Sequence, residues 1–154
     1  MLKIPILDDI GFFGPFILMF YAIIVLSCRV PYMIVYALFI ILSSCLNRFL
    51  KRMIRQPRPS ERGILYKYEI VTGADAYGMP SGHSQSVALS TVFIYLVTKS
   101  MYSLIGCSFV SCLTFYQRYK YKRHSITQII AGTFTGIVVA FISYCLISEY
   151  LRYS

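Results

Sequence analysis

Long apolar stretches, free of charge except for Arg48, alternate with shorter polar ones along the 154 residues of the chain. A helix needs roughly 20 apolar residues to cross the hydrocarbon core of a bilayer. Five stretches come near that length, although the third and fourth are somewhat short: residues 10–28, 30–50, 81–98, 101–116 and 126–148. The pattern predicts an all-α fold in one domain over residues 1–154, an integral membrane, antiparallel helical bundle of about five transmembrane helices.

A polar segment over about residues 51–79 separates the second and third predicted helices and is rich in charged residues. Each spanning helix must cross fully to satisfy its backbone, so consecutive helices alternate in direction. Twelve of the 15 Lys and Arg residues then fall on one side of the membrane, which we call side A, and only Arg29, Lys99 and Arg152 fall on the other. This asymmetry is the feature that a function has to explain.

Composition points to the same class of protein, with 57% apolar and only 14% charged residues. A net charge of +9 would suggest nucleic acid as the partner of a soluble protein. Here the basic residues flank apolar spans, so the bilayer and a phosphorylated lipid are the expected partners and nucleic acid is not. The five cysteines all lie in apolar stretches without metal or redox spacing, which is typical of buried free thiols.

Three sequence blocks reach side A at the ends of predicted helices. The first runs over residues 51–59, the second is Pro80-Ser-Gly-His83, and the third extends from Arg118 through His124 to Gln128. Taken singly, a basic loop after a membrane span is usually topogenic, a Pro-Ser-Gly run is a turn, and a histidine near a helix start is a polar cap. These readings do not explain why all three blocks share one face and hold both histidines of the chain.

Together the blocks have the chemistry of a phosphate site. Lys51, Arg58 and Arg118 supply fixed positive charge, and an arginine can bind phosphate oxygens through two hydrogen bonds. Ser81 and Gly82 stand at a helix N-terminus, which favours an anion.

Two imidazoles beside a phosphate suggest one nucleophile and one general acid, and His83 and His124 are the candidates. We expect neither a metal nor a cofactor, because no carboxylate cluster accompanies these histidines.

The order and spacing of the blocks resemble the signature of the type 2 phosphatidic acid phosphatase superfamily, over about residues 51–136. That signature is Lys-x6-Arg-Pro, then Pro-Ser-Gly-His, then Ser-Arg-x5-His-x3-Asp. The resemblance implies a helical bundle, usually with six core helices, and a metal-independent phosphohistidine mechanism. It implies His124 as nucleophile, His83 as general acid, and five residues that bind the substrate phosphate, namely Lys51, Arg58, Ser81, Gly82 and Arg118.

Two positions depart from that signature. Gln117 stands in place of Ser, and Gln128 in place of the Asp that orients the nucleophile. Four residues along a helix from His124, a glutamine can still fix the imidazole tautomer if its oxygen faces the ring, but it lends much less charge stabilisation. Dolichyl diphosphate phosphatases resemble this chain in having Gln at that position, and also in the runs around Gln56–Pro59 and Met79.

The resemblance therefore implies hydrolysis of a polyprenyl, dolichyl-type diphosphate to the monophosphate. Three alternatives stay open: a phosphatase for phosphatidic acid or another lipid monophosphate, a lipid phosphotransferase, and a non-catalytic lipid-phosphate binding protein. The positive-inside tendency places side A in the cytosol, whereas the resemblance implies a luminal site in the endoplasmic reticulum membrane if the chain is eukaryotic. The sequence leaves the oligomeric state open.

Overall fold

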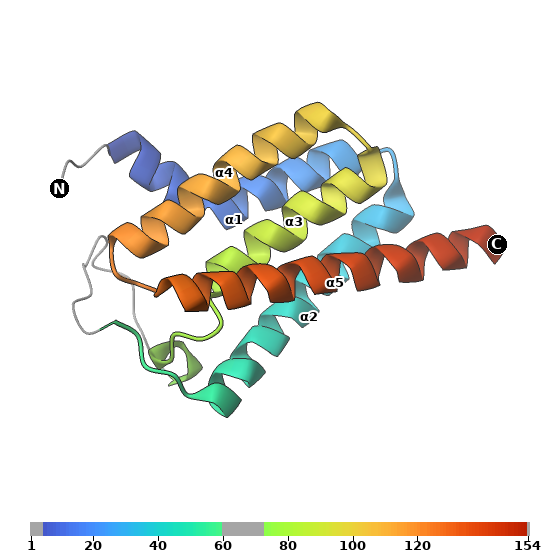
Figure 1. Ribbon diagram of the computed structural model, residues 1–154. Coiled ribbons are helices and arrows are strands. Elements are labelled where there is room, and N and C mark those ends of the chain that lie inside the picture. The colour runs from blue at the N-terminus through green and yellow to red at the C-terminus, as the bar shows by residue number, and fades with distance from the viewer. Residues whose placement is uncertain (1–4, 60–72, 154) are drawn as a thin grey trace.

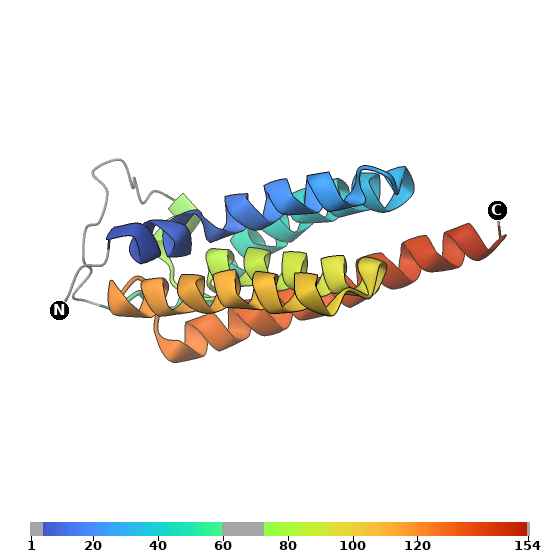
Figure 2. The same ribbon diagram turned by 90° about the horizontal axis from the view of Figure 1, so that it is seen from above.

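The computed structural model describes residues 5–59 and 73–153, which form five α-helices and one short 3-10 helix (Figure 1). The elements follow one another as α1 (Pro5–Leu26), α2 (Val30–Ile54), η1 (Gly73–Ala76), α3 (Gly82–Thr98), α4 (Met101–Lys120) and α5 (Ile126–Tyr153). Seen from above, the long helices run roughly side by side, and the C-terminal part of α5 extends beyond the others (Figure 2). The predicted all-α bundle of five helices is confirmed.

Helix α3 lies at the centre of the bundle and packs against each of the other four α-helices. Ten of its 17 residues are buried, and these include the polar side chains of Ser84, Gln85, Ser90 and Thr91. Several of them find partners inside the protein, as when the Thr91 and Ser111 hydroxyls lie 2.9 Å apart between α3 and α4. A helix with this much polar surface can lie at membrane depth because its neighbours, rather than lipid, cover it.

The outer helices present their apolar side chains outward. Three of them, over Ile6–Leu26, Val30–Ile54 and Ile126–Tyr153, are long and apolar enough to cross a membrane on their own. Large exposed side chains such as Phe16, Ile41 and Phe134, each at least 60% exposed, are the surface expected where lipid is the solvent. The chain is an integral membrane protein.

Helices α3 and α5 approach closely because α5 carries glycines where α3 passes. A Cβ atom on Gly136 would lie 2.2 Å from the Gln85 carbonyl oxygen, and one on Gly132 would lie 2.3 Å from that of Ser81. Small residues four apart allow such backbone contact between membrane helices. This contact fixes the start of α3 against the first half of α5.

The helices at side A are longer than the apolar pattern predicts. Helix α2 continues four residues past position 50, and α4 continues four residues past position 116, so Lys51 and Arg118 lie on the last turns of helices. Helix α1 begins at Pro5 rather than at residue 10 and includes Asp8. Asp8 is buried and accepts hydrogen bonds from Lys120 Nζ at 2.9 and 2.8 Å, which stabilises these polar ends. Part of the predicted polar segment, residues 60–72, lies outside the described residues.

Candidate functional site

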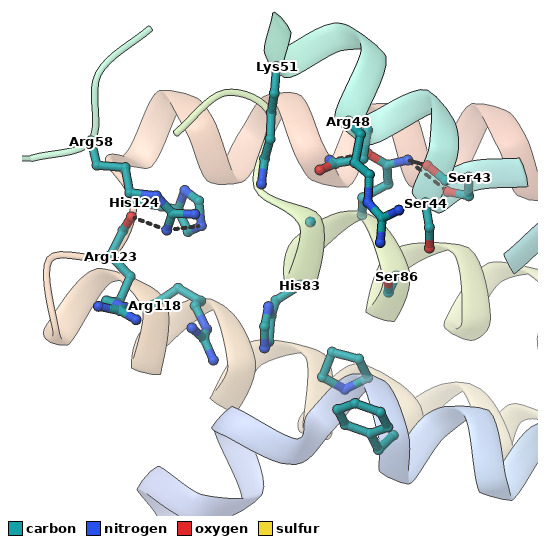
Figure 3. Close-up of a pocket in the computed structure, with 15 residues that line it drawn as sticks. Ser43, Ser44, Arg48, Lys51, Arg58, His83, Ser86, Arg118, Arg123 and His124 are labelled. Carbon is teal, nitrogen blue, oxygen red and sulfur yellow. Dashed lines mark hydrogen bonds between the residues drawn. The ribbon is translucent and has the colours of Figure 1, made fainter. Parts of the chain in front are cut away.

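The three side-A blocks meet at one pocket of about 520 Å³ (Figure 3). Residues from four helices and from the chain segments between them line it. They include six of the eight residues that the sequence predicts for the site, namely Lys51, Arg58, Gly82, His83, Arg118 and His124. Helix ends that are distant in the chain thus bring both imidazoles to one cavity.

Positive charge dominates the pocket. Lys51 and Arg118 line it although they are only 3% and 2% exposed, and Arg58 reaches it from the segment after α2. No Asp or Glu is among the described residues that line the cavity. Several cations gathered around one cavity create a strongly positive field, so the pocket is suited to bind an anion.

His124 is held by hydrogen bonds on the side of its ring away from the cations. Its Nδ1 lies 2.9 Å from the Gly78 carbonyl oxygen and 3.3 Å from Gln128 Oε1. A carbonyl oxygen can only accept, so Nδ1 carries the proton and donates it to Gly78. The unprotonated Nε2 then lies on the pocket side, where Arg58 Nη1 is 3.4 Å away.

Four contacts fix the orientation of the Gln128 amide. Its Nε2 donates to the Pro57 carbonyl oxygen at 2.9 Å and to Gln56 Oε1 at 3.2 Å. Its Oε1 accepts from the Ser125 backbone N–H at 3.2 Å and faces His124 Nδ1. The amide therefore points its oxygen toward the imidazole, which is the arrangement in which a glutamine supports the same tautomer as a carboxylate.

Burial lowers the pKa of His124 to about 3, and the positive charges of Arg58, Arg118 and Lys51 add to that effect. The hydrogen bond with Gln128 acts weakly in the opposite direction. Without an anion in the pocket, the ring is therefore neutral at any physiological pH. A neutral imidazole with its lone pair on Nε2 is the form that a nucleophile requires.

His83 has a different environment. It lies in the first turn of α3, and its ring packs against Phe12 of α1 with the ring centroids 5.9 Å apart. Phe12 also lies under the Arg118 guanidinium, whose central carbon is 4.9 Å from the ring centroid. Within the described part of the chain, the His83 ring nitrogens make no hydrogen bond that would fix a tautomer.

Ser81 and Gly82 are both predicted to bind the substrate phosphate, but only Gly82 lines the pocket. The Ser81 side chain is fully buried, caps the helix by accepting from the Ser84 backbone N–H at 3.4 Å, and is not part of the pocket lining. Its own backbone N–H donates to the Gln128 carbonyl at 3.0 Å. Gly82 does line the pocket. The first amides of a helix lack partners in the helix itself, so this end can still receive an anion.

Several residues of the site were missed by sequence reasoning. Gly78 supplies the shorter hydrogen bond to His124, and a Cβ atom there would lie 2.5 Å from the Gln128 amide, so a side chain at this position would displace that amide. Arg123 and Arg48 also line the pocket and had been grouped with the general basic charge of side A. The signal for Gly78 was its place two residues before the Pro-Ser-Gly-His block.

A buried polar cluster between α2 and α3 forms part of the pocket wall. Asn47 Nδ2 donates to Gln85 Oε1 at 2.7 Å and to the Pro80 carbonyl at 3.3 Å, and Gln85 Nε2 donates to Ser43 Oγ at 2.7 Å. These bonds join α2 to the start of α3. Since Lys51 lies one turn after Asn47, they also set where its ammonium group enters the pocket.

Residues 32–152 match the family model described as the PAP2 superfamily. The chain is 31% identical over 125 residues to "Dolichyldiphosphatase 1" of Dictyostelium discoideum, covering 73% of this chain and 51% of that protein. It is 27% identical over 106 residues to "Dolichyldiphosphatase" of Saccharomyces cerevisiae, covering 62% of this chain and 44% of that one. The chain thus spans about half the length of the curated relatives it matches.

A solved structure has a similar fold, that of the "first transmembrane PAP2 type phosphatidylglycerolphosphate phosphatase from Bacillus subtilis". The TM-score is 0.72, and the superposition covers 96% of this chain and 80% of that one at 18% sequence identity. At that identity the likeness concerns the fold alone. It agrees with a helical bundle that spans the membrane.

Proposed function

The chain belongs to the PAP2 superfamily, and from that premise we propose that it is a membrane lipid phosphatase that hydrolyses a polyprenyl, dolichyl-type diphosphate to the monophosphate. One observation carries the proposal. His124 presents Nε2, in a tautomer held by Gly78 and Gln128, to a pocket lined by cations from separate elements. The names of the two curated relatives support a diphosphate as the substrate.

In the first step, His124 Nε2 attacks the terminal phosphorus of the bound diphosphate. The N–P bond forms while the bond from that phosphorus to the bridging oxygen breaks, and polyprenyl monophosphate leaves. Lys51, Arg58 and Arg118 offset the charge of the transferring phosphoryl group. His83, carrying a proton beside the bound anion, donates it to the bridging oxygen as the bond breaks.

In the second step, water attacks the phosphohistidine. His83, now neutral, takes a proton from the water, the N–P bond breaks, and inorganic phosphate leaves. During the lifetime of the intermediate the His124 ring is cationic, and the Gly78 carbonyl and Gln128 Oε1 stabilise its Nδ1–H. The mechanism needs no metal ion, since fixed cations of the chain provide the positive charge.

The glutamine at position 128 fits this substrate. A lipid monophosphate departs as a stable anion, so its displacement requires a less activated nucleophile than the displacement of an alkoxide from a monoester. The Gln128 amide, with its oxygen toward His124, orients the imidazole. Orientation is the part of the usual aspartate's role that a diphosphatase needs. A binding protein without catalysis would need neither the fixed tautomer nor a second histidine in the pocket.

Replacement of His124 by Ala tests the proposal. We expect hydrolysis of a polyprenyl diphosphate by the purified protein to fall by about 10⁴-fold or more, because the nucleophile is lost. Binding of polyprenyl monophosphate should survive, since Lys51, Arg58 and Arg118 remain. Acid-labile, base-stable labelling from a substrate with radioactive terminal phosphate should appear in the unchanged chain and be absent from the variant. Residual hydrolysis near the original rate would refute the mechanism.

A substrate panel tests the specificity. The proposal expects polyprenyl diphosphate to have a higher kcat/KM than phosphatidic acid or polyprenyl monophosphate. A strong preference for phosphatidic acid would reject it in favour of a monophosphate phosphatase. Transfer of the phosphoryl group to an added alcohol in preference to water would instead identify a phosphotransferase.

We also propose that the membrane is that of the endoplasmic reticulum, with the pocket on the luminal side. The names of the curated eukaryotic relatives support this location. Co-localisation of the tagged chain with a marker of that membrane, and protection of an N-terminal tag from added protease, would test both parts.

A further inference from the structure

The pocket continues beyond the cations that surround His124. Its lining includes Ser43, Ser44 and Arg48 of α2 and Ser86 of α3, and Pro15 and Phe16 of α1 close one side. Figure 3 shows the order along the cavity: His124 and Arg58 lie at one end, Lys51 and His83 between, and Arg48, Ser44 and Ser86 at the other. The transfer reaction assigned above to His124 uses only the first part.

Arg48 is placed to act in this second part. It lies three residues before Lys51 on α2, so the two share a helix face and their Cα atoms are offset by about 4.5 Å along the helix axis. Its guanidinium is directed into the pocket, toward the Ser44 and Ser86 hydroxyls (Figure 3). Within the described residues, Arg48 has neither a hydrogen bond nor an ion pair. An arginine among apolar positions of a membrane helix calls for an anionic partner or water.

The hydroxyl groups around Arg48 differ in what they can offer. Ser44 Oγ donates its proton to the Ile40 carbonyl at 3.0 Å, so it is committed to its own helix. The Ser86 hydroxyl makes no hydrogen bond within the described part of the chain and lies one turn after His83 on α3. Arg48 and Ser86 are therefore two donors in this part of the cavity that make no hydrogen bond to another described residue.

The direction of the reaction decides which group reaches them. In a phosphoryl transfer the attacking and leaving atoms lie roughly in line on opposite sides of the phosphorus. With His124 at one end of the cavity, the leaving group lies toward the other end. In a diphosphate that leaving group begins with a second phosphate. The two phosphorus atoms are no farther apart than about one helical turn, so residues one turn apart on α2 can contact both phosphates.

We propose that Arg48, with Ser86, binds the lipid-linked phosphate of the diphosphate, and so determines the preference for a diphosphate over a single phosphate. This assignment rests on the function proposed above. The guanidinium can donate two parallel hydrogen bonds to that phosphate. Its positive charge also stabilises the negative charge that develops on the leaving monophosphate. A single-phosphate substrate makes no use of Arg48, because its only phosphate occupies the place beside His124.

Replacement of Arg48 by Gln tests this, with kcat/KM measured on a polyprenyl diphosphate and on p-nitrophenyl phosphate. The second compound has one phosphate and a leaving group that departs readily. We expect kcat/KM for the diphosphate to fall by about 10- to 100-fold, the range for a lost charge-assisted contact, and that for p-nitrophenyl phosphate to change less than threefold. Arg48→Lys should recover part of the loss, because lysine restores the positive charge but not the two parallel hydrogen bonds of the guanidinium.

Arg52→Gln is the matched control, since Arg52 is exposed, as Arg48 is, and lies on the next turn of α2, but does not line the pocket. Its rates should equal those of the unchanged protein on both substrates. The assignment would be overturned if Arg48→Gln lowered kcat/KM equally for both substrates. It would also be overturned if Arg52→Gln lowered kcat/KM for the diphosphate as much as Arg48→Gln does, because either result indicates a general charge effect. If the unchanged protein cleaves p-nitrophenyl phosphate through His124 but not the diphosphate, the proposed substrate fails instead, and the two failures are distinguishable.

Discussion

The part of the pocket that holds His124 and the part that holds His83 differ in how firmly they fix an imidazole. His124 sits in a chain turn between two helices, yet its ring has two acceptors for Nδ1, and the amide behind it makes three further contacts. His83 sits on a helix at the centre of the bundle, yet its ring has only a packing contact with Phe12 among the described residues. Regular secondary structure thus carries the loosely held ring, and the irregular chain carries the rigid one.

That difference suits two separate tasks. A nucleophile must present one defined nitrogen throughout the reaction, so a fixed tautomer is an advantage. A general acid must give up a proton in one step and take one back in the next, so a ring without a permanent partner is better placed for it. The comparison therefore supports the division of roles between the two histidines. Three changes can break or refine it.

Of these three changes, His83→Ala is expected to have the largest effect, and that effect should depend on the leaving group. For phenyl phosphate, whose leaving group needs a proton, loss of a general acid should lower kcat by about 10²- to 10⁴-fold. For p-nitrophenyl phosphate the fall should be much smaller, because that leaving group departs as an anion. The measurement is kcat on a series of aryl phosphates. His124→Ala is the reference, since loss of the nucleophile should reduce all of them alike. A fall in His83→Ala that is independent of the leaving group would contradict the assigned role.

A smaller effect is expected from Gln128→Leu, which removes the carboxamide behind His124 and leaves Gly78 as the remaining acceptor. One hydrogen bond to the transiently cationic ring is lost, so kcat should fall by about 10- to 100-fold, with KM little changed. Thr127→Val is the control, because Thr127 is an exposed polar neighbour on the same turn. Gln128→Glu restores an acceptor for His124 but turns a carboxylate toward the Pro57 carbonyl. It should recover kcat while lowering Tm. An unchanged kcat in Gln128→Leu would show that Gly78 alone fixes the tautomer.

The contrast between the two rings also marks how far the sequence predicts the site. The sequence groups both histidines with Lys51, Arg58 and Arg118, because the chemistry of these side chains follows from their residue type and the alternation of helices places them on one face. The Gly78 carbonyl could not be found this way, since every residue has one and only its direction matters. The orientation of the Gln128 amide likewise depends on the Pro57 carbonyl, 71 positions away.

The fold shows a similar limit. The apolar stretches predicted five helices, but Lys51 and Arg118 were placed beyond the helix ends because charge was taken as the sign of the membrane boundary. In the structure both helices continue, since the polar ends are stabilised by contacts with other segments, such as that of Lys120 with Asp8. The depth of a charged residue depends on its neighbours in space, and a pattern along one chain does not contain them.

The most specific effect concerns pH, and at mildly acidic pH it is small. Because the folded protein holds the pKa of His124 near 3, below the ordinary value of about 6.5 in an unfolded chain, protonation opposes folding. This group leaves stability unchanged above about pH 6.5. Between about pH 6.5 and 3 it lowers the free energy of unfolding by about 1.4 kcal/mol per pH unit. The check is Tm against pH for the unchanged protein and for His124→Asn, since groups common to both cancel in the difference. Bound inorganic phosphate should reduce the difference, because an anion beside the ring favours its protonated form. Parallel curves for the two proteins, with or without phosphate, would mean that His124 is less buried among cations than the pocket indicates.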